Sequence, residues 1–85
     1  MNIEGKIIYI SGLIKINNFE KREVVIETQE KYPQKIMIEF SNKTITALDK
    51  YRSDDFVKVE FNLRGREWNG KYFNTLSGWK IEPVI

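Results

Sequence analysis

The chain has 85 residues, of which 31% are charged and 41% hydrophobic, and its formal net charge is +2. That length allows one domain over residues 1–85 with a small core, and the composition is typical of a folded chain. The sequence contains no His and no Cys, which excludes disulfides, thiolate nucleophiles, Ser–His–Asp relays and zinc sites built on these ligands. Since no signal-peptide pattern and no apolar run of membrane-spanning length is present, we expect a cytoplasmic protein with no membrane partner.

The first half of the chain is predicted to form three β-strands, over residues 3–14, 23–28 and 35–40. Gly5 and Gly12 interrupt the first segment, which is rich in β-branched residues, and this predicts a long strand that bends. Pro33 cannot join a central ladder, so the connection between the second and third strands is a turn. The mostly polar residues 15–22 are expected to form the first long loop.

Residues 41–51 break the alternating pattern. Ile45 and Leu48 are three positions apart, and Ser41 or Asn42 is available as an N-cap. This predicts a short helix that covers one end of a barrel.

The second half of the chain is predicted to be a β-hairpin. Residues 56–64 alternate cleanly between apolar and polar. The residues expected to face inward are Val57, Val59, Phe61 and Leu63. Asn69-Gly70 is a strong hairpin signal because both residues tolerate positive φ. Residues 71–81 then form the return strand, with Trp79 and Ile81 expected on the core face.

The order β-β-β-α-β-β predicts an all-β fold, a five-stranded Greek-key OB-fold barrel with one short helix between strands 3 and 4. Other small barrels, such as the SH3-like type, do not explain an 11-residue helical insert at this point.

The predicted hairpin carries a basic and aromatic cluster, since residues 62–80 hold four basic side chains against one carboxylate. The candidate binding residues are Arg64, Arg66, Trp68, Lys71 and either Tyr72 or Phe73. The two arginines share strand parity with Trp68 and should point outward, so that bases stack on the indole and the guanidinium groups bind phosphates. In the alternative interpretation, Trp68 folds back over the barrel mouth as a lid.

Four further candidates lie outside the hairpin: Phe19 and Arg22 in the first loop, and Tyr32 and Lys35 around the turn between strands 2 and 3. OB domains bind oligonucleotides on the face of strands 2 and 3, flanked by the first loop and the loop between strands 4 and 5. The structural alternatives are that Phe19 packs into the barrel end and that Tyr32 packs on Pro33.

The hairpin resembles that of the bacterial single-stranded-DNA-binding proteins (SSB), which have a Leu-Arg-x-Arg-x-Trp run followed by an aromatic-polar-Thr return. The matching residues are Leu63, Arg64, Arg66 and Trp68, then Phe73 (or Tyr72 in the neighbouring register) and Thr75. This resemblance implies that Trp68 stacks on DNA. Over nearly its full length the chain more closely resembles short bacterial and phage proteins known only as a domain of unknown function, through residues 27–35 and 66–71. Those proteins are regarded as OB-fold and SSB-like.

The sequence departs from the SSB pattern in two ways, which affect the expected partner recruitment and DNA binding. Residues 81–85 do not resemble the acidic-aromatic tail by which SSB proteins recruit repair and replication enzymes, so recruitment in that manner is not expected. The stacking aromatics of strands 2 and 3 have no clear equivalents. Glu27 and Glu39 are among the outward candidates there, and carboxylates on this face would repel phosphate.

The sequence therefore predicts an SSB-like protein that binds single-stranded DNA, with RNA as an alternative ligand, and that forms a homo-oligomer. No cofactor, metal site or catalytic activity is expected, because the adjacent Asp54-Asp55 pair is typical of a solvated turn. The pathway, whether DNA replication, repair or a phage function, is left open. The alternative function is an OB-fold protein-interaction or oligomerisation module without nucleic-acid binding, since aromatics and Arg are also enriched in protein interfaces.

Overall fold

The computed structural model describes residues 1–84, so that Ile85, the last residue of the predicted domain, lies outside the described part. The elements are β1 (Asn2–Ile10), β2 (Ile14–Ile16), β3 (Phe19–Glu27), β4 (Lys35–Ser41), the 3₁₀-helix η1 (Asn42–Lys50), β5 (Phe56–Trp68) and β6 (Lys71–Pro83). Within residues 1–84 no helix is long and apolar enough to cross a membrane.

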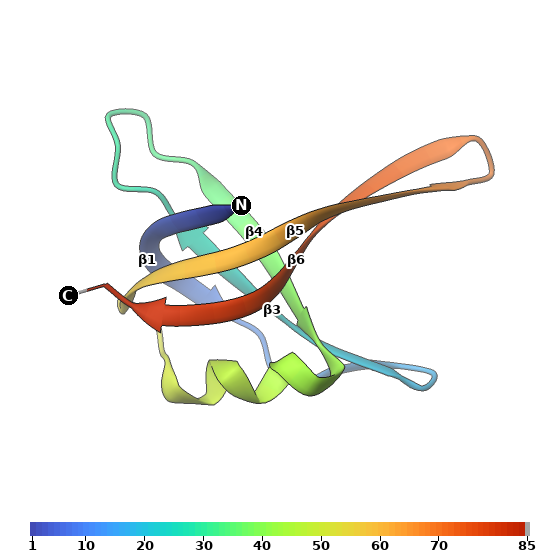
Figure 1. Ribbon diagram of the computed structural model, residues 1–85, viewed down its shortest axis with the longest axis horizontal. Coiled ribbons are helices and arrows are strands. Elements are labelled where there is room, and N and C mark those ends of the chain that lie inside the picture. Colours follow the sequence, from blue (N-terminus) through green and yellow to red (C-terminus); the bar gives the residue numbers. More distant parts are fainter. Residues whose placement is uncertain (85) are drawn as a thin grey trace.

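The strands close into a barrel (Figure 1). Their order in the sheet is β1-β5-β6-β4-β3-β2, and an additional pairing of β1 with β3 completes the circuit. All pairings are antiparallel except that of β4 with β6, which meet in parallel at one pair, Glu39 with Ser77. With η1 between β4 and β5, this is the five-stranded OB-fold barrel with a short inserted helix that the sequence predicts, β2 being an added short strand.

Several element boundaries differ from the sequence prediction. The first strand ends at Ile10 instead of residue 14, and residues 15–22 are not a loop, because β2 and β3 form a hairpin in which Ile16 pairs with Phe19. Asn17 makes the tight turn possible, since its φ of 55° lies in the left-handed region that Asn tolerates. In addition, β5 continues past residue 64 to Trp68, and β6 continues past residue 81 to Pro83.

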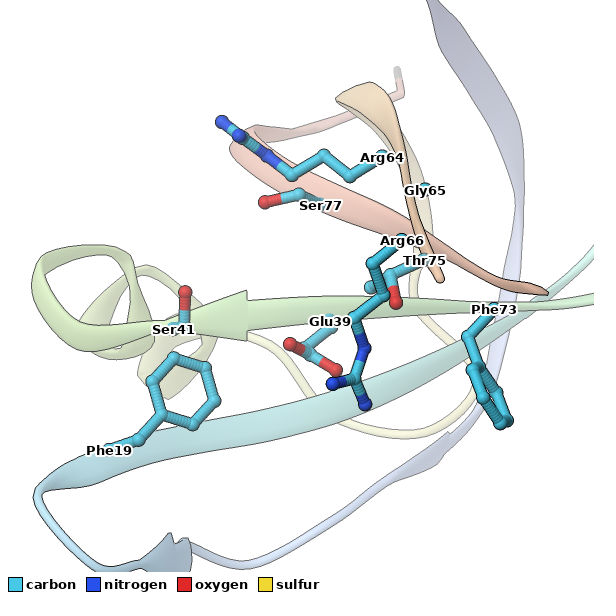
Figure 2. Close-up of a pocket in the computed structure, with 9 residues that line it drawn as sticks. All are labelled: Phe19, Glu39, Ser41, Arg64, Gly65, Arg66, Phe73, Thr75 and Ser77. Carbon is cyan, nitrogen blue, oxygen red and sulfur yellow. The ribbon is translucent and has the colours of Figure 1, made fainter. Parts of the chain in front are cut away.

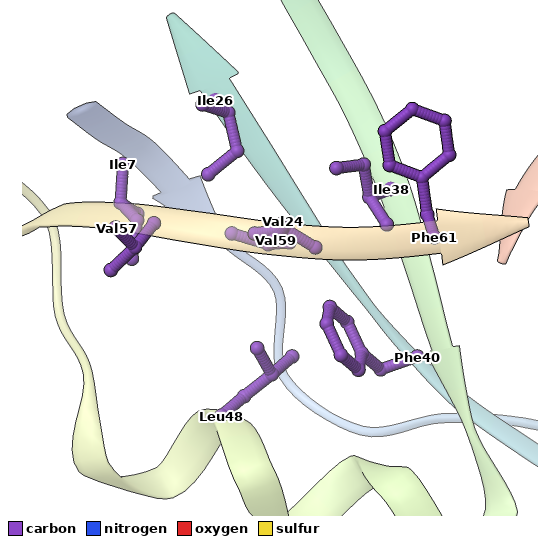
Figure 3. Close-up of a cluster of buried hydrophobic side chains, with 9 residues drawn as sticks. All are labelled: Ile7, Val24, Ile26, Ile38, Phe40, Leu48, Val57, Val59 and Phe61. Carbon is purple, nitrogen blue, oxygen red and sulfur yellow. The ribbon is translucent and has the colours of Figure 1, made fainter. Parts of the chain in front are cut away.

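Among the described residues, the core consists of nine apolar side chains from the barrel interior and η1 (Figure 3). They are Ile7, Val24, Ile26, Ile38, Phe40, Leu48, Val57, Val59 and Phe61. Leu48 comes from η1 and closes one end of the barrel, which confirms the predicted role of the helix. The N-cap of η1 is Ser41, whose backbone N–H donates to Thr44 Oγ1 at 3.1 Å.

Leu63 and Trp79, both predicted to face inward, are exposed instead. Leu63 is 59% exposed because β5 leaves the barrel after Phe61. Trp79 is 53% exposed because a β-bulge shifts the register: Lys80 lies opposite Glu60 but Gly78 lies opposite Phe61, which leaves the tryptophan unpaired.

Gly78 takes the inward position of β6 next to the bulge. A Cβ at this residue would lie 2.5–2.9 Å from three atoms of the Phe40 ring, so any side chain here would displace the ring or the strand. The small residue therefore lets β6 lie directly on the core.

We predict that Gly78→Ala lowers the free energy of unfolding by about 1–3 kcal/mol, the usual cost of overpacking a core. Urea denaturation followed by circular dichroism measures the change as a lower midpoint at unchanged slope. Gly12→Ala is the matched control, because its Cβ would meet nothing within 4 Å. Equal midpoints for the two variants would contradict this account of the barrel closure.

Candidate nucleic-acid interface

Residues 62–77 form a two-stranded arm that extends from the barrel (Figure 1). The outer parts of β5 and β6 pair continuously from Asn62 with Ser77 to Trp68 with Lys71. Asn69 and Gly70 make the turn with φ values of 52° and 77°, as the sequence predicts for an Asn-Gly hairpin.

One face of the arm carries the predicted basic and aromatic cluster. The register places Arg64 opposite Thr75, Arg66 opposite Phe73 and Trp68 opposite Lys71, and alternate residues of a strand share a face. We call these six residues the Arg face. The guanidinium carbon of Arg66 lies 5.5 Å from the centroid of the Phe73 ring, a cation–π geometry that orients both side chains. Trp68 is 61% exposed and does not cover the barrel mouth as a lid.

Tyr72 lies on the opposite face of the arm, so its predicted place beside Trp68 is wrong. Its register partner is Glu67, and the face it occupies also carries Leu63. Phe73, the other aromatic considered, takes the position on the Arg face. Counting back from the turn identifies it, since a two-residue loop that pairs residue 68 with 71 necessarily pairs 66 with 73.

A groove of about 440 Å³ lies between the arm and the outer surface of β3 and β4 (Figure 2). The lining residues are Phe19, Glu39, Ser41, Arg64, Gly65, Arg66, Phe73, Thr75 and Ser77. Phe19 is 39% exposed and lines this groove, so it does not pack into the barrel end. The groove thus joins Phe19, from the first hairpin, to the Arg face.

A set of ion pairs on β3 and β4 lies at the edge of the groove: Glu39 lines the groove, and Lys21 and Glu23 line an adjoining pocket that shares Glu39 with it. Glu23 and Glu39 are directly opposite across the strand pair, and Lys21 Nζ lies 3.3 Å from a carboxylate oxygen of Glu23 and 3.1 Å from one of Glu39. Mainly through its hydrogen bond to Glu39, this arrangement raises the pKa of Lys21 above its ordinary value of 10.5. The sequence analysis missed Lys21 and named its neighbour Arg22.

Arg22 points away from the groove. Its Nη1 donates to Asp49 Oδ1 at 2.8 Å and its Nε donates to the carbonyl oxygen of Ser11 at 3.0 Å, which ties β3 to η1 and to the end of β1. The side chain thus has a structural role that the sequence analysis did not anticipate.

Tyr32 and Lys35 are also outside the groove. Tyr32 belongs to the connection between β3 and β4 and Lys35 is the first residue of β4, and this connection lies on the side of the barrel away from the arm (Figure 1). Tyr32 is 73% exposed, with Lys31 Nζ 5.6 Å from its ring centroid.

Within residues 1–84 no three carboxylates gather as a metal site would require. Asp54 and Asp55 form the turn before β5, as predicted, and an Asp55 carboxylate oxygen accepts the backbone N–H of Arg52 at 3.0 Å.

The architecture described above is that of the OB-fold class of proteins. Residues 2–82 match the family described as "Domain of unknown function (DUF3127)", and the chain belongs to this family. No curated protein is similar to the chain in sequence.

Two solved structures have a similar fold. The second single-stranded-DNA-binding protein (SSBb) of Mycobacterium smegmatis aligns with a TM-score of 0.73 over 99% of this chain and 84% of its own, at 12% identity. The small single-stranded DNA-binding protein of Streptomyces coelicolor aligns with a TM-score of 0.62 over 100% of this chain and 93% of its own, at 9% identity. At such identities the likeness supports the fold alone.

The raised pKa of Lys21 predicts an alkaline loss of stability. Because the pKa is higher in the folded than in the unfolded chain, the stabilisation is present below about pH 10.5 and is lost as pH rises through the folded value. Lys21→Met should therefore lose less of its stability than the natural chain does between about pH 9 and pH 12. Urea midpoints at each pH measure this, and identical pH dependence in the two chains would show that the ion pairs do not contribute.

Proposed function

We propose that the protein binds single-stranded DNA along the groove and the Arg face, without catalysing a reaction on it. The observation that carries the proposal is the composition of the Arg face. It holds three basic residues, Arg64, Arg66 and Lys71, whereas Glu67, which is the one carboxylate of the arm, has the opposite strand parity. Exposed aromatic rings lie among these cations, as in sites that bind single strands by stacking and phosphate contacts.

The groove also favours one orientation of the bound strand. Its arm side is basic, whereas its β4 side carries the carboxylate of Glu39, which is already paired with Lys21. Phosphates would therefore lie along the arginines, and the bases would stack on Trp68, Phe73 and Phe19. Preference for a single strand over a duplex follows because stacking requires bases whose faces are free.

A second candidate function, the docking of a partner protein, is favoured by the opposite face of the arm. Leu63 and Tyr72 are 59% and 77% exposed there, and aromatic residues are enriched in protein interfaces. The two functions differ in their response to salt, since phosphate binding weakens steeply with ionic strength and an apolar contact does not.

Titration of a fluorescently labelled oligo-dT at several salt concentrations tests the proposed function. If about three to five phosphates are contacted, the slope of log K against log salt should be about −2 to −3.5. The matching duplex should bind more weakly at every salt concentration. Homo-oligomerisation stays a prediction, and the molar mass of the free protein from light scattering measures it. Equal affinity for single strand and duplex, or a slope near zero, would reject the proposal.

A pair of variants tests the assignment of the face. Trp68→Ala should remove a stacking contact of about 1–3 kcal/mol and so weaken binding of oligo-dT about five- to 150-fold. Tyr72→Ala removes an aromatic side chain of the same hairpin from the opposite face and should leave the affinity nearly unchanged. Fluorescence anisotropy measures both constants. If Tyr72→Ala causes the larger loss, the binding surface is on the other side of the arm.

A further inference from the structure

The β-bulge in β6 turns a large aromatic side chain outward beyond the end of the groove. Gly78 and Ile81 both have inward positions, opposite Phe61 and Val59 respectively. Because they are three residues apart, a strictly alternating strand could not point both inward. The extra residue, Trp79, is left on the outside with 53% of its surface exposed.

This outward position continues the line of side chains that forms the arm side of the groove. Along β6 the residues of that parity are Phe73, Thr75 and Ser77, all of which line the groove, followed by Trp79. Alternate residues of a strand are about 7 Å apart, so the indole lies one step past Ser77 and about 20 Å along the strand from Phe73. A nucleic-acid strand that follows the groove toward the barrel meets Trp79 next.

The lysines around the Trp79 indole are paired with glutamates, so the ring does not lie in an excess of positive charge. Lys80 lies 3.8 Å from a carboxylate oxygen of Glu82, and Lys58 lies 4.0 Å from one of Glu60 on the neighbouring strand. A contact here would therefore be made through the face of a base and not through a phosphate.

We propose that Trp79 is a second stacking platform, which holds a base of the single strand where the strand leaves the groove at the barrel. This proposal rests on the proposed function and extends it, because it adds a contact outside the groove. It also reverses the expectation that Trp79 is a core residue.

Single-tryptophan variants test the contact directly. Trp68→Phe leaves Trp79 as the fluorescent residue, and Trp79→Phe leaves Trp68. An oligo-dT of about 16 nucleotides, the upper site size of an OB fold, should quench the emission of both variants.

The affinity of Trp79→Ala gives a second measurement. The variant should bind the oligomer of about 16 nucleotides about five- to 150-fold more weakly, whereas one of about 4 nucleotides, held by the Arg face, should lose less than about twofold. The slope against salt should be unchanged, since no phosphate contact is removed. Trp79→Phe should restore most of the affinity, and the urea midpoint should stay that of the natural chain. Tyr32→Ala, an exposed aromatic on the side of the barrel away from the arm (Figure 1), is the matched control.

The outcomes separate the two proposals. If oligo-dT quenches Trp68 but not Trp79, or if Trp79→Ala binds the long oligomer normally, the second platform is rejected and the proposed function stands. If Trp79→Ala weakens both oligomers equally or lowers the urea midpoint, the residue acts within the main site or the fold, and the platform is again rejected. If the natural chain binds no oligo-dT, both proposals fail.

Discussion

The Phe40 ring occupies the space that a side chain at position 78 would need, and the backbone of β6 therefore rests on the core at Gly78. One residue away, Ser77 makes the single parallel pair with Glu39 that joins β6 to β4. This contact closes the barrel and divides β6 into two parts. Toward Pro83 the strand stays on the barrel beside β5, and toward Lys71 it leaves with β5 as the arm. The position of the groove follows, since its two sides diverge from this point.

Beyond the contact the arm has no core of its own, and its register depends on the turn. Ribbons exposed on both faces are prone to slip by one residue, which would exchange the residues of the two faces. The positive φ values of Asn69 and Gly70 favour a two-residue loop whose twist matches that of the strands. The packing of Arg66 against Phe73 supports the same register. A slip would place Tyr72 among the arginines, so the chemistry of the Arg face depends on two turn residues.

Local sequence patterns were sufficient to predict the OB fold, the helix across the barrel end and the outward parity of Arg64, Arg66 and Trp68. These features follow from alternation and turn chemistry within a few residues. The bulge at Trp79 was not predictable in this way, because it lies next to the place where Gly78 meets Phe40, a residue distant in sequence. Likewise, no neighbour in sequence indicates the hydrogen-bond partners of Arg22, because Asp49 and Ser11 come close to it only in the fold.

The electrostatic effect of the carboxylates of β3 and β4 depends on the ion pairs that they make with Lys21. In the sequence prediction, Glu27 and Glu39 are repulsive charges on a face expected to bind DNA, and Glu23 is not considered. In the fold, Glu23 and Glu39 are directly opposite, an arrangement that is unfavourable without a cation between them. Lys21 supplies that cation from the same face, and its ammonium group is therefore paired with carboxylates of the protein itself. The groove thus has a carboxylate on its β4 side and arginines on its arm side, and in the proposed binding mode this asymmetry would favour phosphates along the arm. In the proposed binding mode the two indoles would stack on bases at the two ends of this surface, Trp68 beside Lys71 at the tip of the arm and Trp79 at its base.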